Sequence, residues 1–219
     1  MKKRALISDN GSELGFHIAY QLVERNYDVI LITDVPMDNP EILSFHVNWY
    51  DVWYDNFKNF TINSKLFEDN KNPFDIIYFS HILPGGPSET SFLPYVGNDE
   101  IDSWQHANYS NVISTYQLVK ELSNYIKHDT KVIWKLNGVF DFKWPEGFKY
   151  GTSAIFEASR ISLLKSFSLY MHGIYSGINI SDSDVSVENS ASEIINTIET
   201  ITKENNGNII KKDGTILID

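Results

Sequence analysis

The sequence predicts an α/β protein: a doubly wound parallel sheet of about seven strands with helices on both faces. Short apolar runs alternate along the chain with longer segments of helical spacing, which is the pattern of parallel strands joined by crossover helices. One of these runs, Asp28–Thr33, is nearly continuously apolar, as in strands that are buried on both faces of a sheet. The 219 residues fit the size of one such unit, so we expect a single domain over residues 1–219.

The first half of the chain begins with a strand, a helix and a second strand. Apolar runs that are too short for a helix and end at turn residues predict four strands. These are Arg4–Ser8, Asp28–Thr33, Ser44–Asn48 and Phe74–Ser80. Between the first two, apolar residues recur at the spacing of an amphipathic helix over about Glu13–Arg25. A further short helix is predicted near Trp53–Phe60, and the prolines within Ile82–Asp99 predict a loop.

The second half contains the longer helical patterns. Apolar residues share one helix face over Ile101–Lys127, and Gly151–His172 and residues 190–204 show the same spacing. An aromatic loop is expected at Val139–Lys149. The remaining strands are predicted at Lys131–Asn137, at Gly177–Ser181 and at the end of Asn208–Ile218. Crossovers between parallel strands are almost always right-handed, which leaves few topologies for these elements.

Composition and charge exclude several functional classes. The chain has no Cys, which excludes a disulfide scaffold, a thiolate nucleophile and a Cys-type zinc site. Its 18 Lys and Arg against 29 Asp and Glu give a formal net charge of −11, which argues against sequence-independent nucleic-acid binding. The six His residues show no metal-binding spacing with the acids, so no metal site is expected.

Membrane insertion and secretion are not expected either. No apolar run approaches the roughly 18 residues that span a bilayer. The chain starts with a basic segment, but the apolar stretch that follows it ends too soon for a signal peptide. We therefore expect a soluble cytoplasmic protein that has neither nucleic acid nor a membrane as a partner.

The predicted topology places the candidate site at one edge of the sheet. In open α/β sheets, ligands bind beyond the carboxyl ends of the strands, where the strand order reverses. The residues expected there are Ser8–Gly15, Asp34, Ser80–Ile82 and Asn137. A small-molecule ligand is the natural occupant of such an edge.

The order of these motifs resembles the short-chain dehydrogenase/reductase family, which has a Rossmann-like fold, across nearly the whole chain. The family opens with Thr-Gly-x-x-x-Gly-x-Gly after the first strand, and this chain reads Ser-Asp-Asn-Gly-Ser-Glu-Leu-Gly from Ser8. Only the third glycine is retained, as Gly15, while Asp9 and Glu13 stand at the first two glycine positions. Gly11 lies within the same turn. The resemblance assigns these residues to cofactor binding.

Two further positions match the family's cofactor contacts. Asp34 closes the second strand where an acidic residue would bind the adenosine ribose and favour NAD over NADP, and Asn48 falls where an Asp often contacts adenine. However, Asp9 and Glu13 add bulk and negative charge where the phosphates would lie. A like charge at about 4 Å costs on the order of 1 to 4 kcal/mol. We therefore expect no NAD binding, or weak NAD binding.

The family's catalytic Asn and Ser positions are recognisable in this chain. Asn111 follows Trp104 by seven residues, which is the family's spacing for its active-site Asn. Asn137 stands after the fifth strand, where the family has its catalytic Ser. An Asn there could still donate a hydrogen bond to an oxyanion. The stretch from Ile180 to Ser190 is much shorter than the family's substrate-binding loop.

The family's Tyr-x-x-x-Lys pair has two possible registers. Phe156 and Arg160 match the pair with both functional residues changed, and this is the register we favour. Alternatively Tyr150 matches the Tyr, but Ala154 then stands where the Lys belongs. A phenol with a pKa near 10 is a poor base at neutral pH unless a cation stabilises its anion. The usual hydride-transfer machinery is incomplete in either register.

These substitutions favour a non-redox descendant of the family: a pseudoenzyme, a binding protein or a partner subunit. The alternative is an enzyme, either an NAD-preferring oxidoreductase or a non-redox enzyme that reuses the cleft through Tyr150, His81, Asn111 and Arg160. Family members usually pair through their two long helices, so the resemblance also implies a homodimer or homotetramer.

Overall fold

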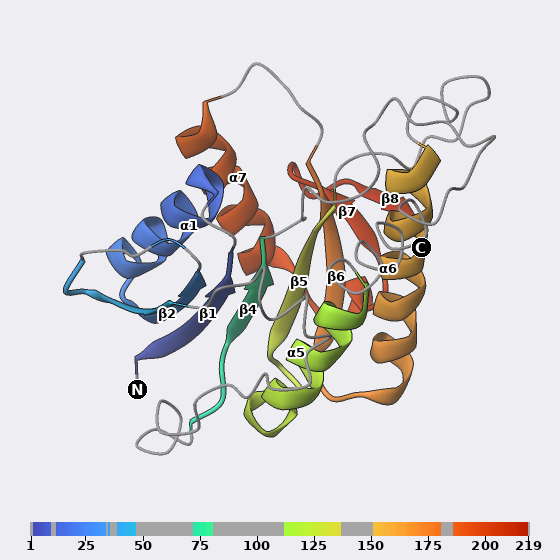
Figure 1. Cartoon of the computed structure of the whole chain (residues 1–219), viewed down its shortest axis with the longest axis horizontal. Coiled ribbons are helices and arrows are strands. Elements are labelled where there is room, and N and C mark those ends of the chain that lie inside the picture. The colour runs from blue at the N-terminus through green and yellow to red at the C-terminus, as the bar shows by residue number, and fades with distance from the viewer. Residues whose placement is uncertain are drawn as a thin grey trace, which may run out of the picture.

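The computed structural model describes residues 2–9, 12–33, 35, 39–46, 72–80, 112–136, 151–180 and 186–218, and Figure 1 shows how they are arranged. Their strands are β1 (Lys3–Ser8), β2 (Tyr27–Thr33), β3 (Ile42–His46), β4 (Ile76–Phe79), β5 (Lys131–Leu136), β6 (Ile174–Asn179), β7 (Ile209–Lys211) and β8 (Ile216–Ile218). They form one sheet in the order β3-β2-β1-β4-β5-β6-β7-β8.

The first seven strands of this sheet are parallel, and the strand order reverses at β1. This strand pairs with β2 on one side and with β4 on the other. The predicted doubly wound parallel sheet is therefore confirmed. Ligand sites in such sheets lie at the reversal point, so the ends of β1 and β4 are the first place to look for one.

The eighth strand is antiparallel to β7 and was not predicted as a separate element. Gly214 has a φ of 89°, a conformation that glycine adopts without steric cost. Its N–H donates to the carbonyl oxygen of Lys211 at 2.9 Å, and the N–H of Lys211 donates to that of Thr215 at 2.8 Å. The expected final strand region is thus divided into a short hairpin.

Helices cover both faces of the sheet, as the sequence predicts. They are α1 (Glu13–Glu24), α5 (Ser114–Leu122), α6 (Gly151–Tyr170) and α7 (Val187–Thr200). Figure 1 shows α1 and α7 together on one side of the sheet and α5 and α6 on the other. Two buried apolar clusters fill the two interfaces, one containing Leu22 and Ile198 and the other containing Leu118 and Leu164.

Most element boundaries lie within a few residues of their predicted places. Helix α1 ends before Asn26, which has a φ of 65°, and β6 begins three residues before the predicted Gly177. Among the predicted helices and loops, three lie wholly and one lies partly outside the described residues. They are the helix near Trp53–Phe60, the loops at Ile82–Asp99 and Val139–Lys149, and the first part of Ile101–Lys127.

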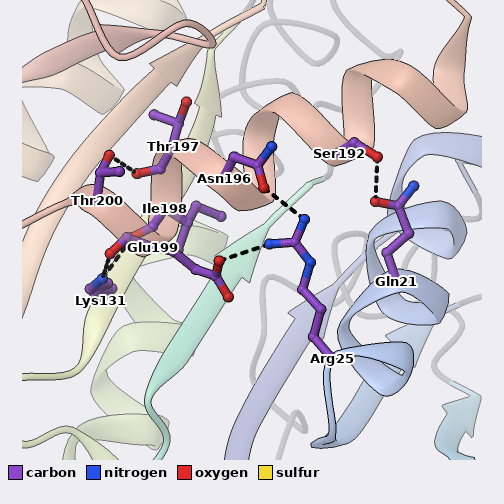
Figure 2. Close-up of polar contacts among 9 residues, drawn as sticks. All are labelled: Gln21, Arg25, Lys131, Ser192, Asn196, Thr197, Ile198, Glu199 and Thr200. Carbon is purple, nitrogen blue, oxygen red and sulfur yellow. Dashed lines mark hydrogen bonds and ion pairs between the residues drawn. The ribbon is translucent and has the colours of Figure 1, made fainter.

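Polar side chains join α1 to α7 across the surface (Figure 2). The Arg25 guanidinium lies 2.8 Å from Glu199 Oε2 and 2.7 Å from Asn196 Oδ1. One turn before Arg25, Gln21 Oε1 accepts the Ser192 hydroxyl at 2.8 Å. These contacts lie above the apolar cluster that the two helices share, so the pair packs as one layer.

A lysine from the sheet donates hydrogen bonds to backbone carbonyl oxygens at the end of α7. The Nζ atom of Lys131, at the start of β5, donates to the carbonyl oxygens of Ile198 at 2.7 Å and Glu199 at 2.8 Å. The last carbonyls of a helix have no partner within the helix and carry a partial negative charge, so a cation is favourable there. Burial lowers the pKa of Lys131 below its ordinary value. Among the described residues, no helix is long and apolar enough to cross a membrane.

Candidate functional site

The carboxyl ends of β1 and β4 meet at two buried serines. The N–H of Ser80 donates to the carbonyl oxygen of Ser8 at 2.9 Å, and both residues are buried. The next residue along the chain, Asp9, extends the pairing with β2 because its N–H donates to Ile32 at 2.8 Å. The sheet therefore brings together Ser8 and Ser80, as the sequence predicts for this edge.

The Asp9 side chain turns inward at the start of α1. One carboxylate oxygen accepts the backbone N–H of Ser12 and the other accepts the Ser12 hydroxyl, each at 2.6 Å. Asp9 is fully buried, and a buried carboxylate is tolerable where strong hydrogen bonds satisfy it. The beginning of α1 also favours negative charge. This turn therefore supplies its own anion at the helix N-terminus.

Gly15 provides the space for that carboxylate. A Cβ atom added to Gly15 would lie 2.9 Å from Asp9 Cβ and would collide with the Asp9 carboxyl group. Ser12 completes the arrangement: its hydroxyl oxygen accepts the N–H of Gly15 at 3.1 Å and lies 3.3 Å from the Ser80 hydroxyl. Asp9 stands at the first glycine position of the family's motif and Gly15 at the third, so the residues at these two positions are in direct contact.

The second acid of the motif behaves differently. The Glu13 side chain is 76% exposed, and its nearest ionic neighbour is His17 Nε2 at 3.9 Å. Glu13 therefore faces solvent rather than the turn. Both acids were expected to add bulk and negative charge where a cofactor phosphate would lie, but only Asp9 lies inside the turn. The remaining predicted cofactor residues, Gly11, Asp34 and Asn48, lie outside the described residues.

Helix α6 carries the two residues of the favoured Phe156 register. Phe156 and Arg160 are both buried, and their i, i+4 spacing places them on one face of the helix. The other expected catalytic residues, Asn111, Asn137 and Tyr150, are outside the part of the chain that the structure describes, and His81 is outside it too. The choice between the two registers therefore stays a prediction.

Arg160 is joined to an acid that sequence reasoning missed. Its Nη1 atom donates to Glu157 Oε2 at 3.2 Å, and the two side chains are only 3% and 5% exposed. The signal in the sequence was the i, i+3 spacing of an acid and a base, which is common on solvated helix faces. Here the pair is buried, where each charge depends on the other to offset the cost of desolvation.

Tyr78 lies within the electrostatic reach of both Asp9 and Arg160. Burial raises the pKa of the Tyr78 hydroxyl above its ordinary value; the charge of Asp9 raises it further and that of Arg160 lowers it. The hydroxyl therefore stays protonated at neutral pH. Sequence reasoning placed Tyr78 in a buried strand but gave no reason to include it in the site.

Four buried polar atoms have no hydrogen-bond partner among the described residues. They are Tyr78 Oη, Trp134 Nε1, Arg160 Nε and Asn179 Oδ1. Buried polar atoms are nearly always hydrogen-bonded, so these atoms are candidates for contact with a water or a ligand group. The described residues contain no group of three or more acids and histidines that could hold a metal ion.

The sequence matches no model of a known protein family and no curated protein. Solved structures match it in fold. A carbonyl reductase from Pseudomonas aeruginosa PAO1 in complex with NADP has a TM-score of 0.78 and 13% identity, with 100% of both chains covered. A variant of a Serratia marcescens short-chain dehydrogenase/reductase has a TM-score of 0.70 and 14% identity, with 97% of this chain and 96% of that chain covered.

A third similar structure is a Burkholderia multivorans protein classed with the short-chain dehydrogenases/reductases, with bound NADP. Its TM-score is 0.74 and its identity 14%, with all of both chains covered. The chain therefore has the fold of short-chain dehydrogenases/reductases, and the resemblance inferred from the order of its motifs is confirmed at the level of the fold.

Proposed function

We propose that this protein uses the short-chain dehydrogenase/reductase fold without that family's hydride transfer, as a pseudoenzyme, a small-molecule-binding protein or a partner subunit. The observation that carries the proposal is the Asp9 carboxylate. It accepts two hydrogen bonds from Ser12 at the start of α1 and is held against Gly15.

The residues of this turn do not fit a dinucleotide. A pyrophosphate at a helix N-terminus depends on free backbone N–H groups and on the absence of nearby negative charge. Asp9 takes the N–H of Ser12 for its own carboxylate and places a full negative charge there. A phosphate about 4 Å away would be disfavoured by on the order of 1 to 4 kcal/mol for each like-charge pair. We therefore propose that NAD(P) binding is weak or absent.

The residues at the family's proton-transfer positions also support a protein without hydride transfer. In the favoured register, Phe156 has no proton to transfer. Arg160 is engaged by Glu157, and an arginine does not titrate in the useful range. Tyr78 is the described phenol within reach of both charges, but its raised pKa makes it a poor base. These residues are suited to binding rather than to proton abstraction.

A binding role has positive support as well. Buried donors on Trp134 and Arg160 and a buried acceptor on Asn179 lack partners among the described residues. A small molecule with complementary acceptor and donor groups would satisfy them. Sites of this kind fix a ligand through a few well-placed polar groups in otherwise apolar surroundings.

The alternative is an enzyme: an NAD-preferring oxidoreductase with unusual residues, or a non-redox enzyme that reuses the cleft. It is favoured by the bound NADP in two of the similar structures and by the same unpartnered polar atoms. Under this alternative Asp9 would have to leave the turn when the cofactor binds, breaking its hydrogen bonds to Ser12.

Calorimetric titration with NAD, NADP and their reduced forms tests the proposal. We expect weak or no binding by the wild-type chain and little or no rise in melting temperature, because a ligand that binds only the folded state must raise it. Replacement of the acid, D9G, should strengthen NAD binding. The matched control E13Q removes a solvent-facing charge and should change nothing. A dissociation constant in the low micromolar range for the wild type would contradict the proposal.

We also propose that the chain is a single cytoplasmic domain that forms a homodimer or homotetramer. An apolar surface on α5 and α6 supports the oligomer. Tyr116 is half-exposed there and stacks on Phe167 with 6.0 Å between ring centroids. Leu169 and Tyr170, at the end of α6, are exposed. Light scattering at micromolar concentration tests this, and a monomer would overturn it.

A further inference from the structure

A single asparagine side chain joins helix α6 to strand β6 just before β7. Asn206 Oδ1 accepts the backbone N–H of Tyr175, the second residue of β6, at 2.8 Å. Its Nδ2 atom donates to the carbonyl oxygen of Ser168, near the end of α6, at 2.8 Å. A side-chain amide supplies an acceptor and donors together, and Asn206 uses both kinds here. We call these contacts the Asn206 clamp.

The position after Asn206 favours glycine. Gly207 has a φ of 86°, which is the left-handed region that glycine adopts without steric cost. A Cβ atom on Gly207 would lie 2.9 Å from Ser168 Oγ. The residue is buried, and its N–H donates to the carbonyl oxygen of Tyr175 at 2.7 Å. The fold therefore places an asparagine directly before a glycine.

An Asn–Gly pair is chemically labile in an open chain. The glycine nitrogen attacks Cγ of the asparagine; the new N–Cγ bond closes a succinimide ring, the Cγ–Nδ2 bond breaks, and ammonia leaves with the proton of the glycine N–H. Water then opens the ring at either carbonyl, which leaves aspartate or isoaspartate. Water is consumed, ammonia is released, and nothing is oxidised or reduced. Glycine favours the attack because no Cβ shields its nitrogen.

The clamp holds both reacting groups in place. The nitrogen of Gly207 is engaged by Tyr175, and the amide on Cγ of Asn206 is fixed through both its oxygen and its nitrogen. The attack therefore requires these three hydrogen bonds to break. A typical net hydrogen bond shifts an equilibrium by about fivefold, so the reactive geometry should be about a hundredfold less populated in the folded protein than in an open chain.

The products of this reaction do not fit the clamp. Aspartate in place of Asn206 keeps an acceptor for the N–H of Tyr175 but loses the donor to Ser168, and it sets a carboxylate oxygen against the Ser168 carbonyl oxygen. Isoaspartate also adds a carbon to the backbone, which displaces the N–H of Gly207. A polar group left without its partner costs more than the bond that it made. A modified chain therefore cannot close as before.

We propose that Asn206 is a deamidation site that the folded protein keeps closed, and that each opening of the Asn206 clamp exposes it to permanent conversion into aspartate or isoaspartate. Water is the only co-reactant. Local opening of this kind occurs in folded proteins at free energies below that of global unfolding. The clamp lies beside the beginnings of β6 and β7, away from the carboxyl ends of the strands, so this inference is independent of the proposed function.

Incubation of the full chain tests the site, with its other Asn–Gly pairs as internal references. Asn10–Gly11 and Asn137–Gly138 lie outside the described residues. In guanidinium chloride all three pairs should deamidate at similar rates, because the chain is open. In native buffer at the same pH, Asn206 should react about a hundredfold more slowly than in guanidinium chloride. Digestion and tandem mass spectrometry measure each pair separately.

Two outcomes of this incubation would overturn the proposal. If Asn206 reacts in native buffer as fast as in guanidinium chloride, the fold does not close the site. If Asn206 stays unmodified in guanidinium chloride while the other two pairs react, it is not a deamidation site.

The variant N206D tests whether the aspartate product fits the clamp. Its matched control, N205D, adds the same charge at the preceding residue, where the side-chain oxygen of Asn205 accepts from Thr202 and a carboxylate can take its place. N206D should unfold at a clearly lower guanidinium concentration than the wild type, and N205D close to it. Equal midpoints for the two variants would overturn the exclusion of the product.

The same exclusion can be measured without a variant. A wild-type sample is partly deamidated in guanidinium chloride, refolded by dilution and digested briefly with a protease. Chains modified at Asn206 should be cleaved first, because they close less well. Equal survival of modified and unmodified chains would overturn the proposed consequence of the modification.

Discussion

The carboxyl group of Asp9 occupies the space that a side chain on Gly15 would need. Asp9 is buried and accepts two hydrogen bonds from Ser12, so it is not free to move aside. The conformation at one position therefore depends on the residue at the other. The short-chain dehydrogenase/reductase turn motif has glycines at both of these positions. In this chain the first is replaced by Asp9, whose carboxyl group contacts Gly15 at the third.

The first prediction concerns this pair. G15A should destabilise the protein by about 1–3 kcal/mol, the usual cost of inserting a methylene where there is no room. In a D9A background the same change should cost much less, because the colliding carboxyl group is gone. Urea denaturation of both single variants and the double variant gives the coupling energy. Additive effects would show that the two residues are not in contact.

A second prediction separates two buried tyrosines. Y78F removes a hydroxyl that has no partner among the described residues, so it should be neutral or stabilise the fold slightly. Y175F removes a hydroxyl that donates to the His172 carbonyl at 2.8 Å and should cost about 1 kcal/mol. Thermal and urea unfolding measure both. A clear loss of stability in Y78F would mean that its hydroxyl is bonded in the folded protein.

The same tyrosine makes stability depend on alkaline pH. Burial raises the pKa of Tyr78 above its ordinary value, whereas the phenol of the unfolded chain ionises near pH 10. Above about pH 10 the unfolded state loses this proton while the folded state keeps it, so the free energy of unfolding falls as the pH rises. Y78F should lose less stability than the wild type between about pH 9 and 11 in urea titrations. Parallel curves for the two proteins would contradict the raised pKa.

The buried pair of Glu157 and Arg160 predicts strong non-additivity. Removing one partner, as in E157Q or R160M, breaks the buried ion pair and should cost about 3–5 kcal/mol. The double variant E157M/R160M leaves no charge and should recover most of this loss. Chemical denaturation checks all three variants. If the double variant is no more stable than R160M, the pair does not compensate as the 3.2 Å contact implies.

The contacts at α7 predict a ranking between two cations. Arg25 and Glu199 are partly exposed, and exposed ion pairs contribute only about 0–1 kcal/mol, so R25M should be nearly neutral. Lys131 donates to two carbonyls at the end of α7, and K131M should cost more than R25M. K120M, on the exposed face of α5, is the control. Hydrogen exchange of the last turn of α7 should rise in K131M alone.

The fold was predictable because its main signals are local. The interiors of runs such as Arg4–Ser8 and Asp28–Thr33 are apolar without interruption, and this marks strands that are buried on both faces. Strand β8 was not recognised separately because it is three residues long and depends on the positive φ of Gly214. A glycine in a polar stretch predicts a turn but does not say that the chain pairs back on itself.

The candidate site was predictable in place but not in detail. The topology alone locates Ser8 and Ser80 at one edge. Acids are almost always exposed unless they are paired, so nothing local indicates that Asp9 is buried while Glu13 is exposed. That difference arises because the side chain of Asp9 meets a glycine and a serine that the folded turn brings to it. The burial of Glu157 and Arg160 is likewise a tertiary effect.

The hydrogen bonds of Asp9 have a consequence for the ligand-free protein. A bound anion stabilises a folded state by an amount that depends on its concentration, whereas an anion that belongs to the chain is always present. The start of α1 is complete as soon as the strand before it has formed, because Ser12 already has its acceptor. The folding and lifetime of this protein in a cell should therefore be independent of the supply of nicotinamide nucleotides.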